Sequence, residues 1–184
     1  MFYTNIIKGI TQNKFVLVLL NEEQYISQLN KIVQSVEKSN KKICYVCLSR
    51  PYKDILNNLK KNNINTKFFF FIDVLSSHYE KISPHKNCMF LDSPNDLKLL
   101  VQAIETAIEK EKCSVLLFDT ISALLIYQES FSILQFTHTL TVEKKEERIK
   151  KLFIAIKKDS FPEKENKEFI NDLKMFADKT IDLD

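Results

Sequence analysis

Val115-Leu116-Leu117-Phe118-Asp119-Thr120 is a run of four apolar residues that ends in a carboxylate and a hydroxyl. Phe69-Phe70-Phe71-Ile72-Asp73 repeats this arrangement closer to the N-terminus. Unbroken apolar runs of this length are typical of parallel strands that helices cover on both faces. Both stretches therefore predict buried strands of an α/β fold, each with an acidic residue at its carboxyl end.

Similar runs alternate with longer segments of helical period along the chain. This alternation predicts an α/β domain of three layers, with a mostly parallel central sheet flanked by helices. No linker divides the chain, so we expect residues 1–184 to form a single domain. The expected strands are Phe15–Leu20, Ile43–Leu48, Phe68–Ile72, Val115–Phe118, Leu152–Ile156 and Thr180–Leu183. The expected helices are Tyr25–Val36, Pro51–Lys61, Leu97–Ile108, Ser130–Arg148 and Glu163–Ala177.

Glycine is almost missing from the sequence. Gly9 is the single glycine, where average usage would give roughly 13. Phosphate-binding loops need several glycines, because their backbone adopts positive φ or approaches the ligand closely. Walker A, dinucleotide-binding and kinase loops are therefore excluded, and so are the nucleophile elbows of hydrolases.

The charges are nearly balanced. The chain has 27 Lys and Arg residues and 24 Asp and Glu residues, a net charge of +3 that is spread along the sequence. This balance does not indicate a nucleic-acid partner. The longest apolar runs, such as Phe15–Leu20, are too short to cross a membrane, and the first residues do not have the pattern of a secretion signal. We therefore expect a cytoplasmic protein with no nucleic-acid partner and no membrane insertion.

The residues that follow each expected strand are the natural places to look for a binding site, because ligands of open parallel sheets bind at the carboxyl ends of the strands. After the first strand, Asn21 and Gln24 are spaced to close a capping box on the next helix. Glu22 and Glu23 between them would repel an anion from the start of that helix. The remaining strand-end residues are Ser49 and Arg50, Asp73, the group Asp119, Thr120 and Ser122, and the stretch 157–159.

Asp119 and Asp73 have two possible roles. A carboxylate after an apolar strand is the pattern of a Walker B strand, in which the acid holds Mg²⁺ through water. Two acids at neighbouring strand ends would together bind a divalent cation. The alternative, which we favour, is that each acid caps the turn that follows its strand.

Six segments, by their order and composition, suggest one known family: Arg50-Pro51-Tyr52, Phe71-Ile72-Asp73, Ser93 to Leu97, Phe118 to Tyr127, Phe136 to Leu140 and Phe176 to Leu183. Together they resemble the archaeal KaiC-like branch of the RecA ATPase fold over nearly the whole chain. The resemblance implies a RecA-like (P-loop NTPase-type) core with Asp119 at the Walker B position. However, Asn21–Gln24 replaces the Walker A loop, and Leu48-Ser49-Arg50 stands where active relatives have a catalytic glutamate. The family's glycine-rich DNA-binding loops are missing too, which argues against both ATP hydrolysis and DNA strand binding.

Cysteine and histidine provide weaker candidates. Cys44 and Cys47 form a C-x-x-C pair, but residues three apart on a strand point to opposite faces and cannot share a metal or a disulfide. His85 and Cys88 have a spacing that zinc sites use. Buried, reduced thiols are the interpretation that we favour for all four cysteines.

The expected helix Ser130–Arg148 is apolar on two sides. Ile133, Phe136 and Leu140 lie on one face, and Phe131 lies on the opposite face near His138. Both faces need cover, either within the domain or from another chain. We therefore predict that Ile133, Phe136 and Leu140 contact a protein partner or a second copy of the chain.

The favoured function is that of a degenerate, non-catalytic RecA/KaiC-like domain that acts as a protein-binding or regulatory module and needs no cofactor. The alternative is a domain that binds Mg²⁺ with ATP or ADP and hydrolyses it little or not at all. In that case Asp119, Asp73 and Arg50 would hold the ligand, together with Ser49, Thr120 and Ser122. A metal-dependent hydrolase is the third possibility, although no nucleophile or histidine stands near the two acids in sequence.

Overall fold

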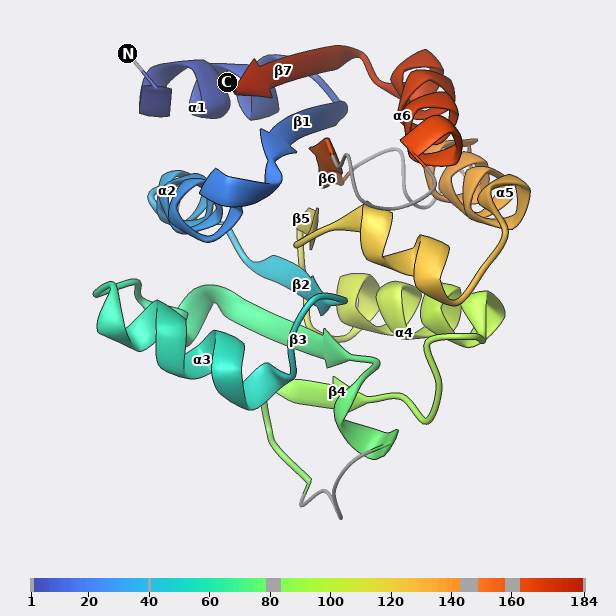
Figure 1. The fold of residues 1–184 in the computed structure, drawn as a ribbon. Helices are drawn as coiled ribbons and strands as arrows, with labels where there is room; N and C mark the ends of the chain where they lie inside the picture. Colours follow the sequence, from blue (N-terminus) through green and yellow to red (C-terminus); the bar gives the residue numbers. More distant parts are fainter. Residues whose placement is uncertain (1, 40, 79–83, 143–148, 158–162, 184) are drawn as a thin grey trace.

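The computed structural model describes residues 2–39, 41–78, 84–142, 149–157 and 163–183. Seven strands form one central sheet in the order β4-β3-β2-β5-β6-β1-β7, and every pair of neighbouring strands is parallel (Figure 1). The strands are β1 (Phe15–Asn21), β2 (Ile43–Cys47), β3 (Phe69–Asp73), β4 (Cys88–Phe90), β5 (Val115–Phe118), β6 (Lys150–Lys157) and β7 (Lys179–Leu183).

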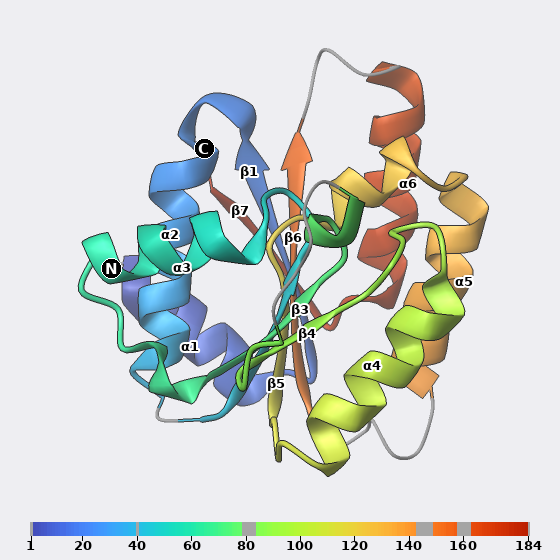
Figure 2. The ribbon, with the colours of Figure 1, turned by 90° about the horizontal axis from the view of Figure 1, so that it is seen from below.

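Helices cover both faces of the sheet, as Figure 2 shows. One face packs against α1 (Phe2–Gln12), α2 (Tyr25–Glu37) and α3 (Tyr52–Lys61). The other packs against α4 (Leu97–Glu109), α5 (Ser130–Val142) and α6 (Glu163–Phe176). The predicted three-layer α/β architecture is therefore confirmed. The part of the predicted helix that covers residues 143–148 lies outside the described residues.

The apolar runs become strands because both of their faces are buried. In β1, Leu17 and Leu19 enter the core beneath α4, α5 and α6, while Val16 and Val18 enter the core on the opposite face. The same alternation separates Cys44 from Cys47, which lie in different cores. The four cysteines are buried and unpaired. The prediction that this C-x-x-C pair cannot share a metal or a disulfide is thereby confirmed.

Two elements were not expected from the sequence. In the helix α1, Ile6 and Ile10 lie one turn apart and are buried against the rest of the domain. Strand β4 has three residues, too few for any periodicity to appear. Both elements form because they extend a layer that already exists: β4 pairs with the edge of β3, and α1 packs beside α2.

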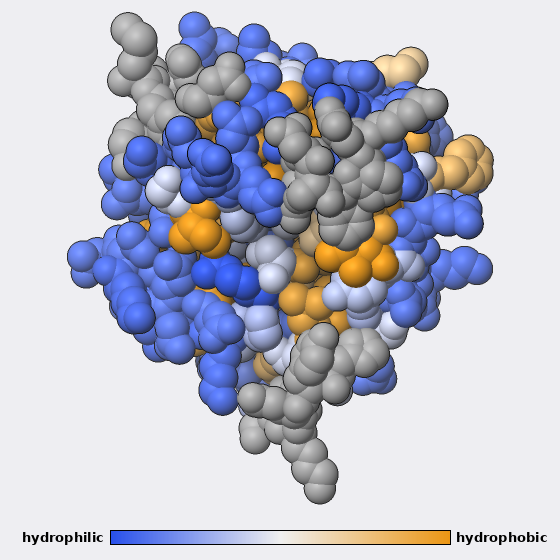
Figure 3. Space-filling model, viewed as in Figure 1, coloured by the Kyte–Doolittle hydropathy of each residue, from blue (hydrophilic) through white to orange (hydrophobic). Residues whose placement is uncertain are grey.

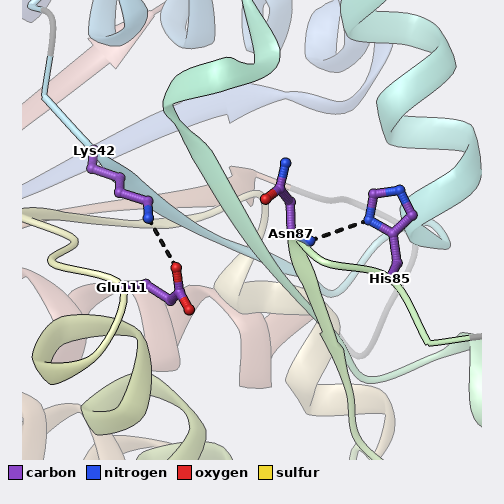
Figure 4. Close-up of polar contacts among 4 residues, drawn as sticks. All are labelled: Lys42, His85, Asn87 and Glu111. Carbon is purple, nitrogen blue, oxygen red and sulfur yellow. Dashed lines mark hydrogen bonds and ion pairs between the residues drawn. The ribbon is translucent and has the colours of Figure 1, made fainter.

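The order of the strands decides where a ligand would bind. After β2 the chain crosses to β3 through α3 on one face, and after β5 it crosses to β6 through α5 on the other. Because β2 and β5 are neighbours, their carboxyl ends flank a topological switch point, where open α/β sheets bind ligands. At the opposite edge of the sheet, Lys42 and Glu111 form an ion pair of 2.9 Å between the segments that lead into β2 and β5 (Figure 4).

Within the described residues, no helix has the length and apolar character needed to cross a membrane.

Candidate functional site

Asp119 follows β5 and is fully buried at the carboxyl edge of the sheet. Its Oδ1 accepts hydrogen bonds from the backbone N–H groups of Leu48 at 3.0 Å, Ser49 at 3.2 Å and Thr120 at 2.8 Å. Its Oδ2 accepts the hydroxyl of Ser49 at 2.6 Å. The carboxylate therefore fixes the turn after β2 against the end of β5.

Ser49 links this carboxylate to α2. The Tyr25 hydroxyl donates to Ser49 Oγ at 2.9 Å, and it also lies 3.2 Å from the carbonyl oxygen of Asp119. The sequence prediction that Ser49 and Asp119 meet at one edge is thus correct. Their contact is part of a hydrogen-bond network that holds two strand ends and a helix together.

Asp73 accepts a similar set of hydrogen bonds at the end of β3. Its Oδ2 accepts the backbone N–H of Tyr52 at 2.7 Å, at the start of α3, and the hydroxyl of Ser76. Its Oδ1 accepts the N–H groups of Leu75 at 2.8 Å and Ser76 at 3.0 Å. Asp73, like Asp119, is fully buried. Asp73 therefore caps the turn after its own strand, as favoured from the sequence, whereas Asp119 mainly caps the turn after β2.

The alternative left open by the sequence, a cation held jointly by Asp73 and Asp119, is not favoured by this geometry. Their strands are not neighbours, because β2 lies between β3 and β5, and two strand spacings amount to about 10 Å. Each carboxylate also accepts several hydrogen bonds from the protein itself. Across the described ranges, no group of three His, Cys, Asp or Glu side chains is arranged to hold a metal. The sequence could not show this, because the order of strands in the sheet differs from their order in the chain.

Burial makes the stability of the domain depend on the protonation of Asp119. Desolvation raises the pKa of this carboxyl from 3.8 to about 6, although hydrogen bonds from Ser49, Leu48 and Thr120 oppose the rise. The folded state therefore retains a proton that the unfolded chain releases above pH 4. The contribution of Asp119 to stability is greatest below pH 4, falls as the pH rises to about 6, and stays lower above that.

We expect this effect to appear as a difference between the wild type and Asp119→Asn, whose amide does not titrate. Relative to the variant, the wild type should lose up to about 3 kcal/mol of unfolding free energy between pH 4 and pH 7. Urea denaturation of both proteins across this range measures the difference. Parallel curves would show that Asp119 is ionised throughout.

The turn after β1 differs from its prediction. Glu22–Gln24 forms a short 3₁₀ helix that leads directly into α2, and Asn21 makes no side-chain cap. The Gln24 side chain bonds to the Gln28 amide at 3.1 Å instead of closing a capping box. Glu22 and Glu23 nevertheless stand in the first turn, where their negative charge disfavours an anion.

Arg50 follows Ser49 directly and is half-buried. Its guanidinium lies near Tyr25: burial raises the pKa of the Tyr25 phenol far above its usual range, and the charge of Arg50 opposes that rise. Nε and Nη2 of Arg50 are buried without a hydrogen-bond partner among the described residues. These two nitrogens therefore make no hydrogen bond to the hydroxyls with which the sequence groups Arg50.

A cavity of about 530 Å³ opens at the switch point between β2 and β5. Three of the residues predicted to hold a ligand line it together: Ser49, Thr120 and Ser122. Ser122 lies in the 3₁₀ helix η4 (Ile121–Ile126), and its Oγ accepts the Ile156 N–H at 3.1 Å. Figure 3 shows hydrophobic side chains near the middle of this face, over η4 and the adjoining strand ends. The remaining lining residues are Glu22, Leu48, Pro51, Leu75, Ala123, Leu125, Ile126, Tyr127, Ile156 and Asn166.

Asn166 is a buried polar residue of this site that the sequence did not predict. It stands in the first half of α6 on the side of Phe169, Ile170 and Leu173, which are all buried. Its Nδ2 donates to the carbonyl oxygen of Ile156 at 3.1 Å, and the side chain is 3% exposed. The signal available in the sequence was the position of Asn166, an amide residue at the helical spacing of the apolar face of α6.

The prediction of a partner contact at Ile133, Phe136 and Leu140 is wrong. All three are buried in the core between the sheet, α4 and α6, and the Phe136 ring packs edge-on against Phe118 with centroids 5.9 Å apart. The opposite face of α5 is the one that reaches the surface, where Phe131 is 66% exposed. The apolar pattern identified both faces but did not show which one the domain itself covers.

His85 and Cys88 form no zinc site in the described part of the chain. The His85 ring accepts the backbone N–H of Asn87 at 3.3 Å (Figure 4) and lies against the ring of Tyr52. Desolvation raises the pKa of the Cys88 thiol well above its usual range, so the thiolate that zinc requires is disfavoured. His85 lies in the turn that leads into β4, and Cys88 is the first residue of that strand.

Comparisons with known proteins give a structural match. No family model matches the chain, and no curated protein matches its sequence. The crystal structure of a KaiC-like protein from the hyperthermophilic archaeon Pyrococcus horikoshii OT3 superposes with a TM-score of 0.59. The two chains are 12% identical over 94% of this chain and 73% of the other. The parallel seven-stranded sheet, its two helical layers and this similarity together show that the chain has a KaiC-like, RecA-type fold.

Proposed function

We propose that this chain is a RecA-type domain that does not hydrolyse nucleotides and acts by binding, as a regulatory or protein-binding module. The observation that supports the proposal most is the state of Asp119. A carboxylate that positions Mg²⁺ for phosphoryl transfer needs a lone pair directed at the metal or its water. The oxygens of Asp119 instead accept hydrogen bonds from Leu48, Ser49 and Thr120, and the side chain is fully buried.

The charges around the cavity favour the same proposal. Phosphate sites combine free backbone N–H groups with Lys or Arg. Among the described residues that line the cavity there is neither Lys nor Arg, and Glu22 is the one with a formal charge. Leu48 and Ser49, at the position where active relatives of the resembled family have a glutamate, offer no general base.

Binding of Mg²⁺-nucleotide without hydrolysis is the second candidate. One observation favours it, namely that the cavity lies at the edge of the sheet where open α/β folds bind ligands.

A thermal melt with and without millimolar Mg²⁺-ATP separates the two candidates. ADP, AMP and Mg²⁺ alone serve as controls. A ligand at 100 times its dissociation constant stabilises a protein by about 2.7 kcal/mol, which moves the midpoint of a chain of this size by roughly 5–11 °C. We expect no nucleotide-specific shift. A shift of that size, present in the wild type and lost in Asp119→Asn, would instead establish a nucleotide sensor.

A further inference from the structure

The cavity at the carboxyl edge has the form of a small-molecule site. Its volume of about 530 Å³ falls within the range of about 300–1,000 Å³ that is typical of ligand pockets. Most of its wall is apolar and includes Leu48, Leu75, Leu125 and Ile156. An apolar molecule that enters it would gain free energy in proportion to the surface removed from water.

Two buried polar groups in the wall lack partners. Thr120 is 2% exposed and Asn166 is 3% exposed, and both line the cavity. Thr120 Oγ1 and Asn166 Oδ1 accept no hydrogen bond within the described part of the chain. The bond from Asn166 Nδ2 to the Ile156 carbonyl fixes the orientation of the amide, so that Oδ1 is the atom left over. An unsatisfied buried acceptor is unfavourable for folding, and one explanation for its presence is a ligand that donates to it.

The available partners define the chemistry of that ligand. Asn166 Oδ1 can only accept a hydrogen bond and Thr120 Oγ1 can also accept one, so a ligand with N–H groups satisfies both atoms. The Ser122 hydroxyl, whose oxygen already accepts the Ile156 N–H, retains its own hydrogen for a carbonyl. Because Glu22 is the charged residue of the described lining, an anionic ligand is disfavoured.

We propose that this cavity binds an uncharged carboxamide with an apolar body, its N–H group directed at Thr120 and Asn166. The proposal rests on the binding function proposed above and names the ligand class for it. A primary carboxamide has two N–H donors and one carbonyl in a small neutral group. The donors match Thr120 Oγ1 and Asn166 Oδ1, and the carbonyl matches the hydroxyl of Ser122.

The test uses naphthalene-2-carboxamide as the probe. It is titrated into the isotope-labelled protein while backbone amide resonances are followed by NMR. Saturable shifts are expected at residues 48–50, 120–127 and 166. Methyl 2-naphthoate has the same shape without N–H groups, and 2-naphthoate has a negative charge. Both should bind at least about tenfold more weakly, since each loses the donated hydrogen bonds. Equal affinity for the ester, or shifts elsewhere in the chain, would overturn the proposal.

A matched pair of variants locates the interaction. Thr120→Val removes the unpartnered hydroxyl from the cavity wall without a change of shape. Thr137→Val removes a second buried, unpartnered hydroxyl, which belongs to α5 and lies outside the cavity. Both variants should melt at the wild-type temperature or above it, because each replaces an unsatisfied polar atom with a methyl group. The amide should bind about five- to tenfold more weakly to Thr120→Val and unchanged to Thr137→Val.

The outcomes remain distinct from those of the nucleotide test. If the amide does not bind the wild-type protein, the ligand class is wrong while the non-hydrolytic binding function stands on the Mg²⁺-ATP melt. If Mg²⁺-ATP stabilises the protein and the amide binds as well, the proposed function fails and the assignment of the cavity survives. An equal loss of amide affinity in both valine variants would show that Thr120 has no specific role.

Discussion

Asp119→Ala should lower the free energy of unfolding by about 3–5 kcal/mol, because it leaves several buried N–H donors without an acceptor. The donors are those of Leu48, Ser49 and Thr120, which all point at one carboxylate oxygen. Each would cost about 1–3 kcal/mol if it stayed unsatisfied. The loss should be smaller than their sum, since Ser49 is partly exposed and water can reach it. Urea denaturation at pH 7 measures the change.

Asp119→Asn is the matched control for this loss. Its carbonyl oxygen can still accept the three N–H groups, and its NH₂ group can donate to Ser49 Oγ in place of the present bond. Tyr25 can then donate to the carbonyl of residue 119, which lies within reach of its hydroxyl. We expect the asparagine variant to retain or exceed wild-type stability at pH 7. An alanine variant as stable as the asparagine variant would mean that the carboxylate does not hold the turn, and would free Asp119 for a metal.

Phe136→Ala should destabilise the domain by about 3–5 kcal/mol, the usual cost of removing a buried phenylalanine ring. Phe136 is buried against Phe118 and the surrounding core, so the truncation leaves a cavity. Phe131→Ala on the exposed face of the same helix is the control, and its effect should stay within about 0.5 kcal/mol.

The mass of the protein in solution shows whether Phe136 contacts its own core or another chain. Light scattering should give the same mass for Phe136→Ala and for the wild type, because Phe136 serves the core of its own chain. If Phe136→Ala kept full stability and changed the mass, the contact with a partner predicted from the sequence would be restored.

The fold could be predicted because burial leaves a direct trace in the sequence. Runs such as Phe15–Leu20 and Val115–Phe118 are apolar at every position, which only a strand covered on both faces requires. Strand β4 has no such apolar run, because a strand of three residues at the edge of the sheet is too short to show one. The helix α1 was overlooked because Ile6 and Ile10 are too few buried apolar positions to mark a helical face.

The site could be predicted only as far as strand ends are predictable. Ser49, Thr120 and Ser122 meet because each follows a strand, and parallel strands end at one edge. Asp73 and Asp119 are kept apart by β2, and the sequence does not give the lateral order of strands. Asn166 reaches the cavity from a helix, so its position depends on packing that no local pattern encodes.

The segment from Leu48 to Tyr52 is tethered at both ends. Asp119 holds Leu48 and Ser49, while Asp73 holds Tyr52, and the two acids belong to strands on either side of β2. This segment is also the rim of the cavity, through Ser49 and Pro51. The rim is therefore already ordered before a ligand binds, and less conformational entropy is lost on binding. The two carboxylates that resemble catalytic acids would thus contribute to affinity without touching the ligand.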